Sequence, residues 1–185
     1  MKHMTSTHTR ALAALAAAGL IWGLTVPLSK IALEWLSPAW LTVARFALAA
    51  PVLAWIARRD LRAAFTPAIA SWGAVGFGLV VVVQNLGIER TSVSHAALIV
   101  GAVPALVAVF AAAAGRGASG PIAWGGFAVA LGGVALIAGS GGNASLLGDA
   151  LVLGSAVLAA ATIVAQAQLL RGRNPVAVTA VQMAA

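Results

Sequence analysis

Few residues in this chain have side chains suited to binding a solute, and nearly all of them lie inside long apolar stretches. Arg45 stands in the middle of SPAWLTVARFALAAP, and Trp22 stands just before LTVPLSK. Amide, imidazole and hydroxyl groups follow along the chain at Gln84, Asn85, His95 and Thr162. These groups donate and accept hydrogen bonds, and an indole stacks on planar molecules. The chemistry that they offer is reversible binding.

Signatures of catalysis are missing from the sequence. It has no HExxH, no pair of aspartates within an apolar segment, no serine with a plausible base, and no cysteine. These patterns would indicate metalloproteases, intramembrane proteases, serine hydrolases and thiol metal sites. We therefore expect that the protein is not an enzyme and that it needs no cofactor and no metal.

The segments that carry these residues have the composition of a membrane protein. Hydrophobic residues make up 62% of the chain and charged residues 8%. About 20 apolar residues in a helix cross the roughly 30 Å of a bilayer's hydrocarbon core. Blocks bounded by charge, Gly or Pro predict spans over residues 11–33, 38–57, 68–88, 93–114, 121–140 and 148–170, after a leader at 1–10 and before the beginning of a seventh span that reaches residue 185. The predicted fold is an all-α polytopic membrane bundle.

Lys and Arg are unevenly distributed between the two sides of this arrangement. Eight lie in the leader and the second, fourth and sixth loops, and two in the other loops; the eight are Lys2, Arg10, Arg58, Arg59, Arg62, Arg116, Arg171 and Arg173, and the two are Lys30 and Arg90. The positive-inside rule then places the N-terminus in the cytoplasm. The net charge of +7 follows from this bias and requires no nucleic-acid partner.

A weak internal repeat relates the two ends of the chain. A shift of 137 residues lays SPAWLTVARFALA over NPVAVTAVQMAA, and it pairs Thr25 with Thr162 and Arg45 with Gln182. Five spans, an odd number, separate the two copies, so equivalent helices must cross the membrane in opposite directions. This pattern predicts an inverted-topology repeat with a substrate site between the halves. Residues 11–141 would form a first five-span repeat and 148–185 the start of a second.

The polar residues and helix-bending residues have expected roles in such a site. We expect Trp22, Gln84, Asn85, His95 and Thr162 to line a substrate cavity, with packing or interhelical hydrogen bonding as the alternative for each. Gln166 and Gln168 are weaker candidates. Pro27 and Pro104 interrupt backbone hydrogen bonding inside spans, and Pro104, at mid-span, is the expected hinge, with a static kink as the alternative. Gly23 permits close helix contact.

Arg45 lies roughly 10 Å from the outer end of its span, at 1.5 Å per residue. A charge at that depth is costly unless it faces the bundle or its side chain snorkels to the surface. We expect Arg45 to face the bundle as part of an outer gate, where it caps helix-end carbonyls or pairs with an acid. Direct binding of a substrate carboxylate is the smaller alternative.

The ordered set of segments IWGLTVPLSK, SPAWLTVARFALAA, QNLGIERTSVSHAALIVGAVPALVAVFAAA and WGGFAVALGGVALI resembles the drug/metabolite transporter superfamily. Within it, the chain is similar to the EamA-like ten-span branch and to aromatic amino-acid exporters. The resemblance implies a bacterial inner-membrane transporter that exports small metabolites, above all amino acids, by alternating access. The family often has a glutamate after the fourth span, where this chain has Gly115, Arg116 and Gly117, so no role of that acid transfers to it.

Two other functions stay open at this point. A broad-specificity drug or nucleobase exporter would use the same architecture, and a membrane subunit without transport activity would need a partner chain. No Asp or Glu lies in the interior of a predicted span, which favours uniport or weakly coupled export. The expected partners are a small-molecule substrate and the lipid bilayer, and the oligomeric state is left open.

Overall fold

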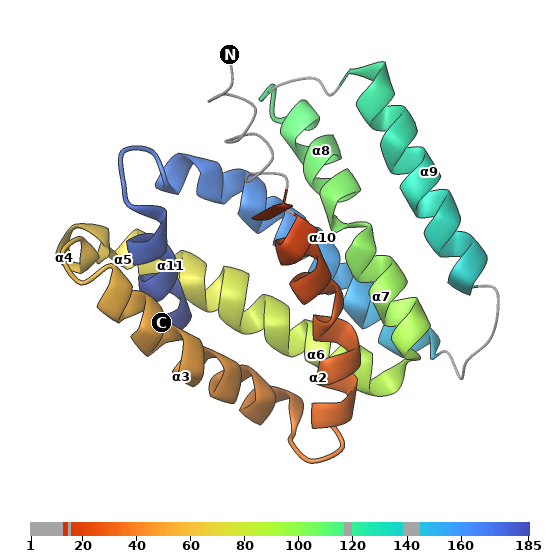
Figure 1. Ribbon diagram of the computed structural model, residues 1–185, viewed down its shortest axis with the longest axis horizontal. Helices are drawn as coiled ribbons and strands as arrows, with labels where there is room; N and C mark the ends of the chain where they lie inside the picture. The colour runs from red at the N-terminus through yellow and green to blue at the C-terminus, as the bar shows by residue number, and fades with distance from the viewer. Residues whose placement is uncertain (1–12, 15, 117–119, 139–144) are drawn as a thin grey trace.

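The computed structural model describes residues 13–14, 16–116, 120–138 and 145–185 (Figure 1). Within these residues all regular structure is helical. A helix covers Ala16–Ala32, its second part being α2 (Thr25–Ala32). The other elements are α3 (Pro38–Ile56), α4 (Leu61–Ala64), α5 (Pro67–Gly73), η1 (Ala74–Leu79), α6 (Val80–Arg90), α7 (Val93–Gly101), α8 (Val103–Ala113), α9 (Pro121–Ala138), α10 (Leu146–Leu169) and α11 (Pro175–Ala184).

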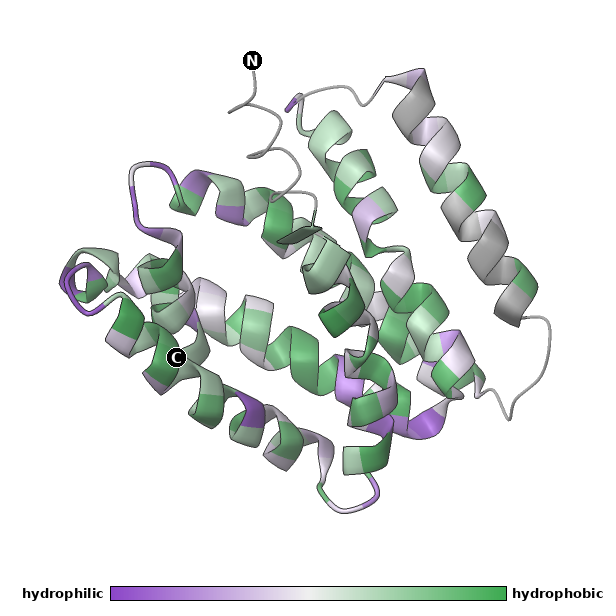
Figure 2. Ribbon diagram, viewed as in Figure 1, coloured by the Kyte–Doolittle hydropathy of each residue, from purple (hydrophilic) through white to green (hydrophobic). Residues whose placement is uncertain are grey.

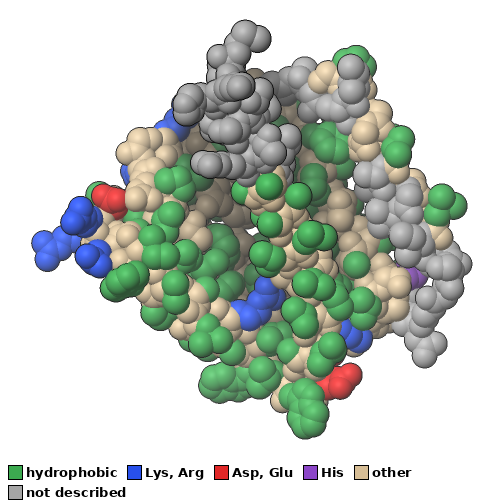
Figure 3. Space-filling view, viewed as in Figure 1, with side chains coloured by type: hydrophobic (Ala, Val, Ile, Leu, Met, Phe, Trp, Pro, Cys, Tyr) green, Lys and Arg blue, Asp and Glu red, His purple; other side chains and the backbone are tan. Residues whose placement is uncertain are grey.

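Four stretches of the described chain are long and apolar enough to cross a membrane: Pro38–Ile56, Pro67–Arg90, Val93–Ala113 and Leu146–Leu169. Large apolar side chains cover the outside, and Leu48, for example, is 76% exposed. Figure 2 shows this hydrophobic character along most helices, and Figure 3 shows Lys and Arg gathered at the edge where α4 lies. An apolar exterior suits contact with lipid, which confirms the predicted all-α polytopic membrane fold.

Local capping signals set where the helices begin. Ser, Thr or Asn accepts a hydrogen bond from a backbone N–H in the first turn of five helices, at Ser37, Thr66, Ser92, Ser145 and Asn174. Proline occupies the first position of α3, α5 and α11, where its missing N–H costs nothing. The observed starts therefore fall within two residues of the predicted ones for these spans.

Two predicted spans are interrupted, and this corrects the expectation of continuous helices. The span at 93–114 breaks at Ala102 into α7 and α8, because Pro104 has no N–H to offer the carbonyl of Val100. The span at 68–88 contains the π-helical turn η1, which includes two glycines in the sequence AVGFGL. Both are sites where a helix bends readily. The beginning of the first predicted span, 11–12, lies outside the described residues.

The sixth span holds the bundle together. α10 packs along α6 and also against α7 and α8, while α11 packs on α3 and α5, and α9 lies beside α7 (Figure 1). Small residues allow this close approach: a side chain at Gly87 would collide with Val152, and one at Gly148 would collide with the backbone of Arg90 and Thr91. The last third of the chain is thus packed into the helices that precede it.

Helix boundaries at the two ends of the chain differ by the shift that the sequence repeat predicts. α2 ends at Ala32 and α10 at Leu169, while α3 begins at Pro38 and α11 at Pro175, a difference of 137 in both cases. The hydrogen bond from Leu33 N–H to the Ser29 carbonyl also has a counterpart 137 residues later. The local structure therefore supports the equivalence of these units.

Candidate functional site

A cavity of about 250 Å³ lies between the first helix, α3, the η1–α6 segment, the α7–α8 break and α10. Its polar lining is Thr25, Arg45, Gln84, Thr162 and Gln166, and its aromatic lining is Trp22 and Phe77. No acidic side chain is among the described lining residues. The cavity therefore combines one cation, neutral hydrogen-bonding groups and aromatic surface.

Residues related by the repeat face each other across this cavity. Trp22 and Thr25 line it from the first helix, and Ala159 and Thr162, 137 positions later, line it from α10. Thr25 Oγ1 donates to the Trp22 carbonyl at 2.5 Å, and Thr162 Oγ1 donates to the Leu158 carbonyl at 2.8 Å. Each hydroxyl proton is occupied within its own helix, so both oxygens are left as acceptors.

The π-helical turn brings backbone and ring into the wall. Gly76 and Phe77 both line the cavity, and Gly76 packs against the methyl group of Thr162, where no side chain would fit. Phe77 meets Phe46 of α3 edge to face, with ring centroids 6.2 Å apart. This segment consequently fixes the distance between α3, α6 and α10 at the level of the cavity.

Arg45 and Ser29 form the first of two equivalent polar pairs. Arg45 Nη1 donates to Ser29 Oγ at 3.4 Å, and Gln166 Nε2 donates to Gln182 Oε1 at 2.9 Å. The shift of 137 carries Ser29 onto Gln166 and Arg45 onto Gln182. Each pair joins a span to the span that follows it, one with a charge and one without.

The capping contact expected of Arg45 is made by another residue. Lys30 Nζ donates to the carbonyls of Ile88, Glu89 and Thr91 at 2.7, 2.9 and 2.7 Å. These carbonyls end α6, where a cation also interacts favourably with the helix dipole. The expectation that Arg45 caps helix-end carbonyls or pairs with an acid is wrong, since its observed hydrogen bond goes to Ser29.

Comparison with known proteins decides the family. A sequence model of the EamA-like transporter family matches residues 9–139, well over half of the chain. The chain belongs to the EamA-like transporter family. No curated protein and no solved structure matches it.

Members of the EamA-like family are transporters and not enzymes, so this integral membrane protein is a membrane transporter, with a small-molecule substrate and the bilayer as partners. The matched residues end shortly before α10. The cavity therefore lies between the EamA-like segment and the helix that follows it, because Thr162 and Gln166 come from α10.

Asn85 of the EamA-like segment does not line the cavity, although we expected it to. It is fully buried, and its Nδ2 donates to Thr42 Oγ1 at 3.0 Å, which ties α6 to α3. Adjacent residues on an α-helix point about 100° apart. Gln84 therefore faces the cavity while Asn85 faces the neighbouring helix.

His95 also lies away from the cavity. Its Nδ1 is 2.9 Å from Asp149 Oδ2, and Asp149 Oδ1 accepts from Thr91 Oγ1 at 2.5 Å. This cluster joins the α6–α7 turn to the first turn of α10, at the end of the bundle where Lys30 lies. Gln84, Asn85 and His95 therefore do not meet, and only Gln84 reaches the cavity.

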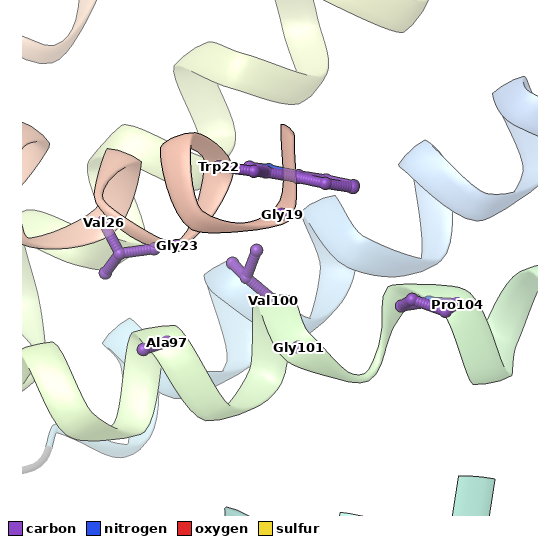
Figure 4. A pocket seen from close by; sticks show the side chains of 8 residues that line it. All are labelled: Gly19, Trp22, Gly23, Val26, Ala97, Val100, Gly101 and Pro104. Atoms are coloured by element: carbon purple, nitrogen blue, oxygen red, sulfur yellow. The ribbon is translucent and has the colours of Figure 1, made fainter. Parts of the chain in front are cut away.

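The residues expected to bend or gate the helices lie in different places. An apolar crevice of about 220 Å³ separates the first helix from α7 and α8, and Gly23 and Pro104 line it together with Trp22 (Figure 4). Figure 4 shows Val100 pointing from α7 toward the first helix; Val100 and Trp22 line both the crevice and the cavity. Pro27 lies in the first turn of α2 and lines neither.

Sequence reasoning missed two lining or supporting residues. Ser29 reads as an ordinary small residue, yet the shift of 137 pairs it with Gln166, a signal that was present in the sequence. Phe77 gave no such signal, because nothing in the sequence announces the π-helical turn that holds it.

Proposed function

We propose that this EamA-like transporter exports amino acids, aromatic or neutral, from the bacterial cytoplasm through the cavity around Arg45. The carrying observation is the lining, which places a guanidinium, two amides and two aromatic rings around one small space. The volume of about 250 Å³ lies below the roughly 300–1,000 Å³ typical of sites for drug-sized ligands. A solute of amino-acid size suits such a cavity better than a bulky drug.

Alternating access needs helices that bend beside the substrate. The break at Ala102 lies between the lining residues Val100 and Val103, and η1 supplies Gly76 and Phe77. Both interruptions of regular α-helix therefore lie in the cavity wall. We propose that the chain holds one EamA-like five-span repeat and the start of an inverted second repeat, and that rocking between them exposes the cavity to each side in turn.

The proposed direction of transport follows from charge. Arg58, Arg59 and Arg62 gather at one end of α3 and at α4, and the positive-inside rule assigns that end to the cytoplasm. The N-terminus then lies on the same side, and the Lys30 end of the bundle faces outward.

Counterflow in proteoliposomes tests this function. The purified full chain, reconstituted with internal unlabelled solute, should accumulate labelled phenylalanine, tryptophan or threonine, and excess unlabelled amino acid should compete. Gln84→Ala should lower the uptake, while Gln168→Ala, an exposed amide elsewhere, should not. Competition by cationic dyes or nucleobases in place of amino acids would indicate the drug or nucleobase exporter. Absence of uptake of every solute would favour a membrane subunit without transport activity.

A further inference from the structure

The charge of Arg45 is not neutralised within the cavity. Among the described residues, Arg45 is the one charged side chain that lines the space, and its hydrogen bond goes to the neutral hydroxyl of Ser29 at 3.4 Å, near the long limit for such a bond. The ion pairs in the described part of the chain are Arg90 with Glu89 and His95 with Asp149, and none of these four residues lines the cavity.

Packing does not require this charge. At the equivalent position of the second unit, Gln182 is 1% exposed and joins Gln166 through a neutral hydrogen bond. The same interhelical link is thus made with an amide where no ligand is to be bound. A buried or half-buried charge in a membrane protein is retained for a partner, and a guanidinium matches a carboxylate in a bidentate manner.

The rest of the lining suits the other end of a zwitterion. Thr25 and Thr162 donate their hydroxyl protons to backbone carbonyls, so their oxygens present lone pairs toward the cavity from opposite walls. The amide oxygens of Gln84 and Gln166 are further acceptors. An ammonium group has three donors and no acceptor, which complements this set.

We propose that Arg45 makes the transporter selective for solutes that carry a carboxylate beside an ammonium group, and that it excludes organic cations. The carboxylate takes the place of Ser29 on the Arg45 guanidinium, while the ammonium group faces the threonine oxygens. This inference rests on the proposed function and narrows it, because decarboxylated amines and nucleobases then fall outside the substrate class.

Calorimetry on the purified full chain in detergent tests the inference without relying on transport. Phenylalanine and phenethylamine differ by the carboxylate alone. The wild-type chain should bind phenylalanine at least about tenfold more tightly, and Arg45→Gln, which copies the second unit, should remove that preference. Arg90→Gln, which removes an exposed arginine outside the cavity, should keep it. Arg45→Lys, which keeps the charge but loses the bidentate fork, should keep part of it.

Two results would overturn the inference: equal binding of the amine and the amino acid by the wild-type chain, or an unchanged preference in Arg45→Gln. The wild-type comparison needs no variant, so the inference can be refuted even if a variant misfolds. Proteoliposome counterflow separates the two proposals. Transport of phenethylamine or adenine in preference to phenylalanine refutes the charge selectivity alone, whereas no transport of any solute refutes the proposed function.

Discussion

Gln166 donates its side-chain amide to Gln182 at 2.9 Å, and both residues lie 137 positions after the pair Ser29 and Arg45. Two helix pairs that are far apart in sequence thus use the same helical positions for a polar contact. In the first pair the contact leaves a cation beside the cavity, and in the second it leaves none. The similarity concerns geometry, and the difference concerns charge.

The neutral pair should contribute to stability, because Gln182 is buried and fixes α11 against α10. Gln182→Ala leaves a small void and removes the partner of Gln166, so we expect a loss of about 1–3 kcal/mol. Thermal unfolding of the full chain in detergent measures it. Gln168→Ala, which changes an exposed amide of the same helix, serves as the control and should stay within about 0.5 kcal/mol. Equal effects of the two substitutions would show that the buried contact contributes little.

Gly76 should be far less tolerant of substitution than Gly78 in the same π-helical turn. A side-chain carbon at Gly76 overlaps the methyl group of Thr162, whereas one at Gly78 meets no atom within 4 Å. We expect Gly76→Ala to cost about 1–3 kcal/mol through overpacking and to lower transport by displacing Thr162 from the cavity wall. Gly78→Ala should leave both near the wild-type values. Unfolding and counterflow are measured on the same preparations, and a pair of indistinguishable variants would refute the contact.

The His95–Asp149 contact should couple the α6–α7 turn to α10. The two side chains are 2.9 Å apart, and Asp149 also accepts from Thr91. A double-mutant cycle with His95→Gln and Asp149→Asn should yield a coupling energy of about 0.5–3 kcal/mol in thermal unfolding. The exposed pair of Glu89 and Arg90, adjacent on one helix, is the matched control and should give at most about 1 kcal/mol. Additive effects at His95 and Asp149 would show that the contact is not energetically linked.

Sequence patterns predicted helix ends well because those ends depend on local chemistry. Ser37 followed by Pro38 starts α3, and Asn174 followed by Pro175 starts α11, each through a cap and a first-turn proline. Hydropathy blocks located the spans for the same reason, since length and composition decide whether a helix suits a bilayer. The break at Ala102 was predicted only as a bend at Pro104.

Partners that are distant in sequence were harder to predict. The depth of Arg45 was readable from its span, but its direction was not, and the carbonyl-capping contact fell to Lys30 through a turn 58 residues away. Gln84 and Asn85 had equal claims on the cavity from the sequence, and the rotation of α6 gave it to Gln84 alone. Such choices depend on how helices rotate against each other, which weak hydrophobic periodicity leaves undetermined in a chain surrounded by lipid.

Pro104 should matter for the rate of transport and much less for binding. It lies beside the break between α7 and α8 in the wall of the crevice, whereas Pro51 lies inside the uninterrupted helix α3. Pro104→Ala restores a backbone donor and lets the two helices join, which stiffens the wall that must bend during alternating access. We expect a several-fold lower counterflow rate with unchanged affinity for phenylalanine in calorimetry. Pro51→Ala, the control, removes a proline from a helix that has no break and should leave the rate unchanged. If the two variants transport equally fast, the proline makes a static kink and the hinge lies elsewhere, with η1 as the next segment to test.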